Sequence, residues 1–308
     1  MAPLLTAAFL HDEGKASYGV HLDSWAEWVY RDMPRTEEGG LQHITYLTDN
    51  EQQLWDDTLM MSVLPLTKIG LVLGRPHYVE EAKRQFLLQS VFFFEKACEV
   101  STFLASASNI CKISKLGFGS MVGLSTDGII SEEQDGDEGI AGLQVRTYLD
   151  KYQAGCLRSQ NAVAIPEFIE MLQLSETDGL RLHLVSSLVS QIDALVKTQD
   201  QESGLWHTIL DDPTSYLEAS ATAGFAYGIL KAIRLRLIPK EERYITCAKK
   251  AIEGVLKNVE NGELRQTSFG TPVFDNLDGY KNIPLTSMPY GQSLALLALT
   301  EHLRHTYL

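Results

Sequence analysis

The spacing of apolar residues is the feature that most restricts the fold. Between Leu184 and Val196 apolar side chains recur every three or four residues, which places them on one buried face of a helix. No segment alternates between apolar and polar residues as a half-buried strand does. We therefore expect an all-α protein, with further helices at about 55–72, 78–95, 162–173, 216–236, 240–258 and 289–305.

Three loops between these helices share a glycine followed by an apolar residue, in segments 39–43, 202–207 and 262–264. Glycine readily adopts the left-handed conformation that ends a helix. Each loop therefore predicts a helix, a glycine turn, a short extended return and the next helix. Such weakly repeated helical hairpins favour a closed or nearly closed ring with its loops at one end. A short β-hairpin is also expected around 261–268.

The length of 308 residues suits one large domain or two ordinary ones. We expect a single domain over 1–308, interrupted by an irregular insert at 101–142. This stretch is rich in serine and glycine and carries an acidic run at 132–138, a composition typical of surface loops.

Charge and cysteine usage exclude several classes of protein. A net charge of -14 and the lack of a Lys/Arg run argue against a nucleic-acid partner. No apolar run approaches the roughly 20 residues of a membrane span, and the first ten residues lack the basic leader of a signal peptide. The four cysteines have no metal-binding spacing, so we expect free thiols, no metal and a cytoplasmic protein.

The first candidate site is formed by Trp55, Asp56 and Asp57 at the start of an apolar helix. His43, which follows a Gly-Gly turn, is a separate candidate because it lies in the same type of loop as His207. An aromatic face beside carboxylates suits sugar recognition. Two structural alternatives remain open. One or both aspartates cap the helix, and His43 is an ordinary structural histidine.

The second candidate site surrounds another helix start and contains Trp206, His207, Tyr216 and Glu218. Histidine is the side chain most easily poised near neutral pH. In the structural alternative, Trp206 belongs to the core, His207 is satisfied locally and Glu218 is an acid of the first helical turn. Tyr290 is a further candidate, although Pro289 beside it is typical of a helix start.

Five blocks at 35–43, 54–61, 81–86, 203–207 and 216–221 together resemble the unsaturated rhamnogalacturonyl hydrolases of glycoside hydrolase family 105, which are related to the family 88 unsaturated glucuronyl hydrolases. The resemblance covers about 1–89 and 162 to the C-terminus. It implies an (α/α)6 barrel that removes terminal 4,5-unsaturated uronic acids from pectin-derived oligosaccharides. It also implies that no metal or organic cofactor is needed.

In the family, an aspartic acid protonates the C4=C5 double bond and directs water to C5, and the resulting hemiketal opens. Such a carboxyl group needs a pKa raised by burial or by a like charge. Asp56 beside Asp57 offers that setting, and we assign Asp56 as catalytic. The residues expected to bind substrate are His43, Trp55, Asp57, Arg158, Trp206, His207, Tyr216, Glu218 and Tyr290.

Two departures from the family pattern limit this assignment. The His-x-Trp element that carries the principal family acid is replaced by 116–121, and the Arg-Gly-Asn segment by 156–161, where Arg158 is the remaining candidate for the substrate carboxylate. The alternative is therefore a barrel that is catalytically impaired or repurposed. The position matching Met1 lies downstream of further family helices, so the ring is expected to be either incomplete or rebuilt from the serine- and glycine-rich insert. An incomplete ring exposes apolar helix faces, and we hypothesise that a homodimer covers them.

Overall fold

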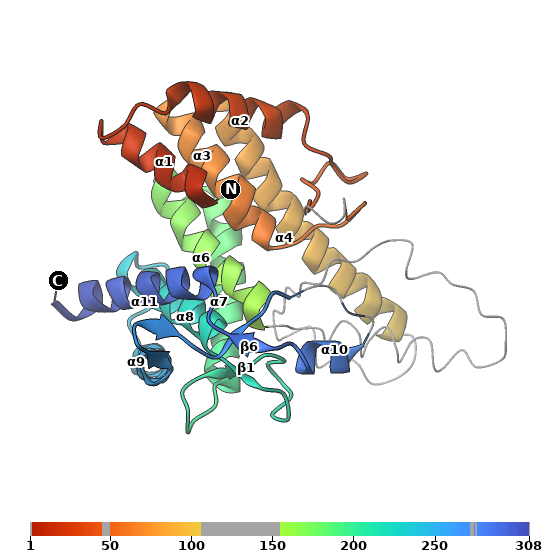
Figure 1. Ribbon diagram of the computed structural model, residues 1–308. Coiled ribbons are helices and arrows are strands. Elements are labelled where there is room, and N and C mark those ends of the chain that lie inside the picture. The colour runs from red at the N-terminus through yellow and green to blue at the C-terminus, as the bar shows by residue number, and fades with distance from the viewer. Residues whose placement is uncertain (1, 45–49, 106–154, 272–273, 275, 308) are drawn as a thin grey trace. The chain divides into compact units, whose positions relative to one another are not determined.

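A computed structural model describes the backbone of residues 2–44, 50–105, 155–271, 274 and 276–307 (Figure 1). Side chains are described for these residues except Ala2 and those within 91–160. The described residues divide into two compact units. The first comprises 2–92 and 167–183, and the second comprises 93–105, 155–166 and the described part of 184–307.

The first unit contains α1 (Ala2–Asp12), α2 (Gly19–Arg31), the π-helix η1 (Leu59–Val63) and α3 (Leu64–Val72). Helix α3 packs against α1, α2 and η1. Its apolar composition fits this central place, since Leu64, Leu66 and Ile69 are fully buried. The helix α4 (Pro76–Ala105) follows after the left-handed turn at Gly74.

The second unit is built around α8 (Ala219–Arg234), which packs against α9 (Glu242–Lys257) and α11 (Pro289–Tyr307), as Figure 1 shows. Small residues allow this close packing. A Cβ on Gly291 of α11, for example, would lie 3.2 Å from the Cβ of Ser220 on α8. Three of the described helices, namely α4, α6 (Gly155–Leu172) and α7 (Gly179–Thr198), contribute residues to both units, and the short α10 (Leu277–Lys281) belongs to the second.

Short antiparallel strand pairs connect the helices of the second unit. Strand β1 (Trp206–His207) pairs with β2 (Leu217–Glu218), with Trp206 opposite Glu218. Strand β3 (Val259–Glu260) pairs with β4 (Glu263–Leu264), and β5 (Thr267–Ser268) pairs with β6 (Leu285–Thr286). These pairs are too short to form a layer of the fold, and they serve to hold the loops at the starts of α8 and α11.

The expected helices are all present, and the all-α fold class is confirmed by the described helices. Of the described helices, α1, α2 and α10 were not predicted. Helix α4 continues to Ala105 and so includes the first residues of the stretch predicted as an insert; the remainder, 106–142, lies outside the described residues.

The predicted glycine turns are confirmed. Gly39, Gly204 and Gly262 have φ values of 83°, 76° and 82°, and each precedes extended residues; Gly39 and Gly204 come after helices α2 and α7, whereas Gly262 lies in the turn between strands β3 and β4. The hairpin expected around 261–268 forms between β3 and β4, whereas β5 pairs with β6 instead of extending that hairpin.

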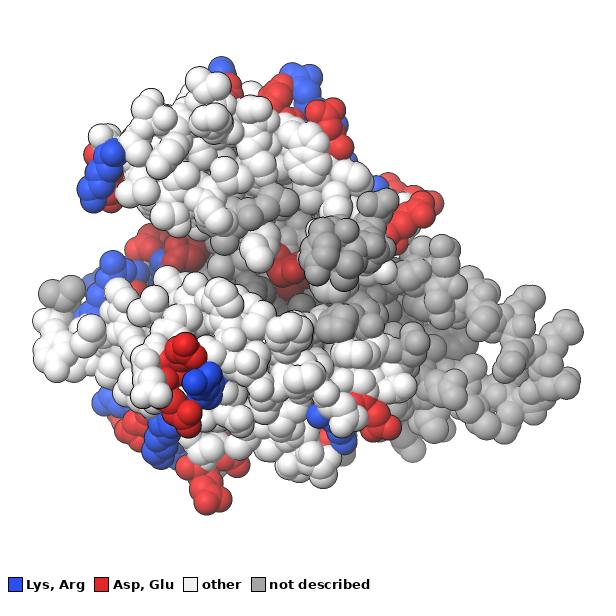
Figure 2. Space-filling view, viewed as in Figure 1, with Lys and Arg blue, Asp and Glu red and all other residues white. Residues whose placement is uncertain are grey.

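None of the described helices combines the length and the apolar composition that a membrane span requires. On the face drawn in Figure 2, basic and acidic side chains are interspersed among uncharged ones. The described residues on that face form no extended basic surface.

Candidate active site

In the first unit, His43 and Trp55 form a stacked aromatic pair. Their ring centroids are 4.1 Å apart and the planes differ by 6°. His43 Nδ1 lies 2.9 Å from Asp57 Oδ1, and the two side chains are 14% and 21% exposed. The cluster therefore presents a flat aromatic surface beside a carboxylate, with partial access from solvent.

Two hydrogen bonds to Gln53 fix the positions of the His43 and Trp55 rings. The His43 N–H donates to the Gln53 carbonyl at 3.0 Å, and the Trp55 indole N–H donates to Gln53 Oε1 at 2.9 Å. The turn before His43 is also fixed, since the side chains of Arg84 and Gln85 both donate to the Gly39 carbonyl. Gln53 and Gln85 are therefore positioning residues that sequence reasoning missed, because a single glutamine carries no motif.

Asp56 is the buried member of the carboxylate pair, with 1% exposure, and Asp57 is the one beside His43. Thr58, the N-cap of η1, makes no side-chain capping bond. A π-helix directly after the aspartates is noteworthy, because π-turns within helices are frequent at functional sites. The pair thus contributes one buried carboxyl group and one carboxylate in contact with the aromatic pair.

In the second unit, Trp206 is fully buried. Its indole N–H donates to the Leu195 carbonyl at 2.9 Å, and its ring packs edge-on against Phe225. His207 follows it on β1, and the His207 Nδ1 lies 2.6 Å from the Ser215 carbonyl oxygen. The packing of Trp206 therefore holds the loop at 202–207 in place. His207 is the partly exposed side chain of the two.

Glu218 is fully buried at the start of α8, where its carboxylate accepts hydrogen bonds from the Ala221 N–H and the Ser220 hydroxyl. It also accepts one from the Ser268 N–H at 3.0 Å. Burial raises the pKa of Glu218, although these hydrogen bonds lower it. Glu218 thus joins the α8 cap to strand β5.

Ser268 connects three of the predicted residues. Its N–H reaches Glu218, its hydroxyl lies 2.9 Å from the Tyr216 hydroxyl, and its carbonyl accepts a hydrogen bond from the Tyr290 hydroxyl. Sequence reasoning missed Ser268, because only the pairing of β5 with β6 places it there. Tyr216, Glu218 and Tyr290 are brought together by this serine.

Helix α10 supports the same loop. Tyr216 packs against the buried side chains of Ile209, Tyr280 and Ile283, and Lys281 Nζ lies 2.6 Å from Asp212 Oδ2. The lysine holds the pKa of Asp212 well below its usual range. The loop carrying Tyr216 is therefore fixed by both apolar packing and an ion pair.

Arg158 lies in α6, but its side chain is outside the described part of the chain, as are residues 116–121. Within the described residues, no three His, Cys, Asp or Glu side chains come together in a way that suits a metal ion. The described candidates thus fall into two clusters. One is centred on Trp55 in the first unit and the other on Ser268 in the second.

A comparison with known protein families shows to which family this chain belongs. The sequence profile described as "Glycosyl Hydrolase Family 88" matches residues 1–98 and 161–306. The chain belongs to this family. The unmatched stretch, 99–160, agrees with the interval in which the expected family motifs are lost.

Individual relatives confirm the resemblance to unsaturated rhamnogalacturonyl hydrolases. The unsaturated rhamnogalacturonyl hydrolase YesR of Bacillus subtilis (strain 168) is 30% identical over 304 residues, which cover 97% of this chain and 75% of YesR. A crystal structure of a possible family 105 member from Salmonella enterica is 48% identical with a TM-score of 0.80. A similar structure from Klebsiella pneumoniae is 45% identical with a TM-score of 0.80, and each alignment covers 100% of this chain and 71% of the solved one.

Proposed function

We propose that this family 88 protein is a glycoside hydrolase that acts on terminal 4,5-unsaturated uronic acids of pectin-derived oligosaccharides. The observation that carries the proposal is the buried Asp56 beside the stacked His43 and Trp55, in a chain whose relative YesR is an unsaturated rhamnogalacturonyl hydrolase. Stacked aromatic rings suit a sugar face, and neighbouring carboxyl groups suit proton transfer.

The proposed reaction is hydration followed by release of the neighbouring sugar. The Asp56 carboxyl group donates its proton to C4 while water adds to C5 and returns a proton to the same carboxylate. The hemiketal formed at C5 opens the ring, and the resulting hemiacetal at C1 releases the neighbouring sugar. This differs from acetal hydrolysis by two flanking carboxylates, because the double bond itself is consumed.

The other candidate residues receive supporting roles in this proposal. Asp57 orients His43, and Trp55 supplies the sugar-binding surface. Within the second unit, Trp206 and Glu218 hold the loop that carries His207 and Tyr216, and Ser268 joins Tyr216 to Tyr290. Arg158 is proposed to bind the substrate carboxylate.

Replacement of Asp56 tests the assignment of the acid. In an assay that follows loss of the ultraviolet absorbance of the double bond, Asp56→Asn is expected to lower kcat by about 100-fold or more, the usual contribution of a general acid. Asp32→Asn, at an exposed aspartate that ends α2, is the matched control and should stay near the wild type. Unchanged activity of Asp56→Asn would assign the chemistry to another residue.

A cytoplasmic location and a homodimer also belong to this proposal. Cys247 is a buried free thiol whose pKa burial raises to about 12, and free cysteines are usual in a reducing compartment. Exposed apolar side chains on α11, namely Leu296, Leu303 and Tyr307, offer a surface for a second copy. Light scattering at micromolar concentration should give the mass of a dimer, and a monomeric mass would count against it.

A further inference from the structure

A basic cavity lies in the second unit, where α8 and α11 end. Its volume is about 960 Å³, within the range typical of small-molecule sites. None of the candidate active-site residues lines it. The lining residues are Ile233, Arg234, Arg236, Leu237, Ile238, Pro239, Lys240, Arg304 and His305.

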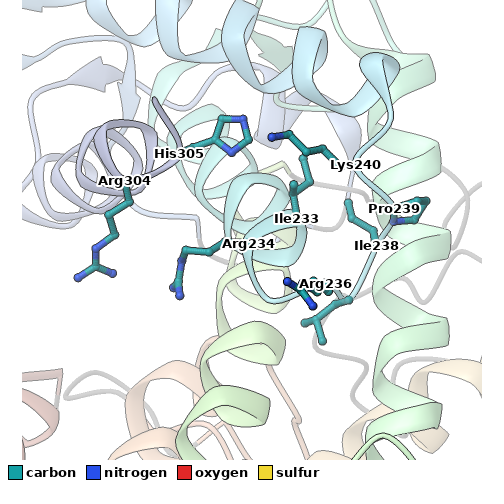
Figure 3. Close-up of a pocket in the computed structure, with 9 residues that line it drawn as sticks. Ile233, Arg234, Arg236, Ile238, Pro239, Lys240, Arg304 and His305 are labelled. Atoms are coloured by element: carbon teal, nitrogen blue, oxygen red, sulfur yellow. The ribbon is translucent and has the colours of Figure 1, made fainter. Parts of the chain in front are cut away.

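The charge of this cavity is opposite to that of the whole chain. Two arginines are joined by one buried carboxylate, because Glu301, 1% exposed, accepts hydrogen bonds from Arg234 and Arg304. Figure 3 shows these two arginines extending to the same side. Arg236 and Lys240 have no ion pair within the part of the chain that the structure describes, and Glu241 beside Lys240 is bonded to Arg243. The cavity therefore keeps an excess of positive charge.

Arg236 occupies a backbone conformation that normally favours glycine. Its φ is 57°, and it ends α8 in a turn closed by the Leu237 N–H on the Ala232 carbonyl at 2.8 Å. A long side chain in this conformation costs free energy that glycine would avoid. An arginine nevertheless occupies this position, and its side chain lines the cavity.

The imidazole of His305 lies on the same cavity and faces Lys240 in Figure 3. Burial lowers the pKa of His305, and the positive charges of Lys240, Lys249 and His302 lower it further, although Glu301 acts in the opposite direction. The surroundings of His305 are thus positive on balance, as expected of a surface that attracts anions.

We infer that this cavity binds a small organic anion carrying two or more carboxylate or phosphate groups. Arginine side chains match both oxyanions with paired N–H donors, and the apolar side chains of Ile233, Ile238 and Pro239 offer contact for the body of the ligand. Acidic oligosaccharides and sugar phosphates share this chemistry. The inference does not depend on the proposed hydrolase activity.

Calorimetric titration of the full chain with trigalacturonate and, separately, with fructose 1,6-bisphosphate tests the inference and distinguishes the two sources of charge. Saturable binding of either anion is expected, and it should weaken about tenfold in Lys240→Gln, which removes one charge-assisted contact. Lys257→Gln, at an exposed lysine in the last turn of α9, removes the same charge outside the cavity and should change the affinity less than twofold.

A second variant separates binding from folding. Arg236→Gly relieves the left-handed strain and removes a cation, so it should raise the melting temperature while weakening anion binding about tenfold. Trp55→Ala should leave this binding unchanged, because Trp55 does not line the cavity. The inference is overturned if neither anion binds saturably at millimolar concentration, or if Lys257→Gln weakens binding as much as Lys240→Gln does.

Discussion

Trp55 is the residue that gives the first cluster its shape. It stacks on His43 and is held by Gln53 through its indole N–H. Trp55→Ala removes the aromatic surface proposed for the sugar, and we expect kcat/KM to fall at least about tenfold, equivalent to ~1.4 kcal/mol. Trp28→Ala, at an exposed tryptophan of α2, is the control and should remain near the wild type in steady-state kinetics. Equal losses in both variants would argue against a specific role for Trp55.

The burial of Glu218 predicts that its contribution to the free energy of unfolding depends on pH. Burial raises its pKa above the ordinary 4.5, so the folded chain binds this proton more readily than the unfolded chain does. Its contribution to stability is complete below the ordinary carboxyl pKa and is lost as the pH rises through the folded-state pKa. Glu218→Ala should therefore reduce the free energy of unfolding more at about pH 4 than at about pH 7, by about 1–3 kcal/mol at the lower pH.

Urea denaturation at the two pH values measures this difference. Glu241→Ala is the matched control, because Glu241 is the N-cap of α9 but is exposed and makes no side-chain capping bond. Its effect should stay below about 0.5 kcal/mol at both pH values. A larger effect of Glu218→Ala at the higher pH would contradict the assigned direction of the pKa shift.

At the scale of elements, the glycine turns could be predicted most directly, because a single glycine in the sequence marks each turn. Gly204 has a φ of 76°, and a Cβ there would lie 2.2 Å from the Lys250 carbonyl oxygen. Gly204→Ala should therefore lower the free energy of unfolding by more than about 2 kcal/mol. At Gly262, φ is 82° but nothing lies within 4 Å, so Gly262→Ala should cost only about 1 kcal/mol. Similar losses in urea denaturation would show that conformation alone, without the close approach, sets the cost.

The sequence predicted long helices better than short or weakly patterned elements. Helices α8, α9 and α11 repeat apolar residues over several turns, whereas α10 has five residues and its place depends on Asn276 and Lys281. The pairing of β5 with β6 joins residues that are far apart in the chain, and two-residue strands have no readable alternation. Such elements follow from tertiary contacts, which local patterns do not encode.

At the scale of the whole molecule, the family could be predicted because its motifs are spread along the chain in order. The profile match at 1–98 and 161–306 follows nearly the same boundaries as those motifs. The roles of single side chains could not be predicted as well. Trp206 and Glu218 sit beside glycine-turn and helix-start signals, but their full burial depends on Leu195, Phe225 and Ser268.

The most direct test of the proposed function is the stoichiometry of the reaction with an unsaturated rhamnogalacturonan disaccharide. Loss of the ultraviolet absorbance of the C4=C5 double bond is followed together with release of rhamnose. We predict equal amounts of the two, and no reaction with the saturated disaccharide, because hydration consumes the double bond before the sugar leaves. Release of rhamnose with the double bond intact, or no reaction by the folded protein, would contradict the proposal.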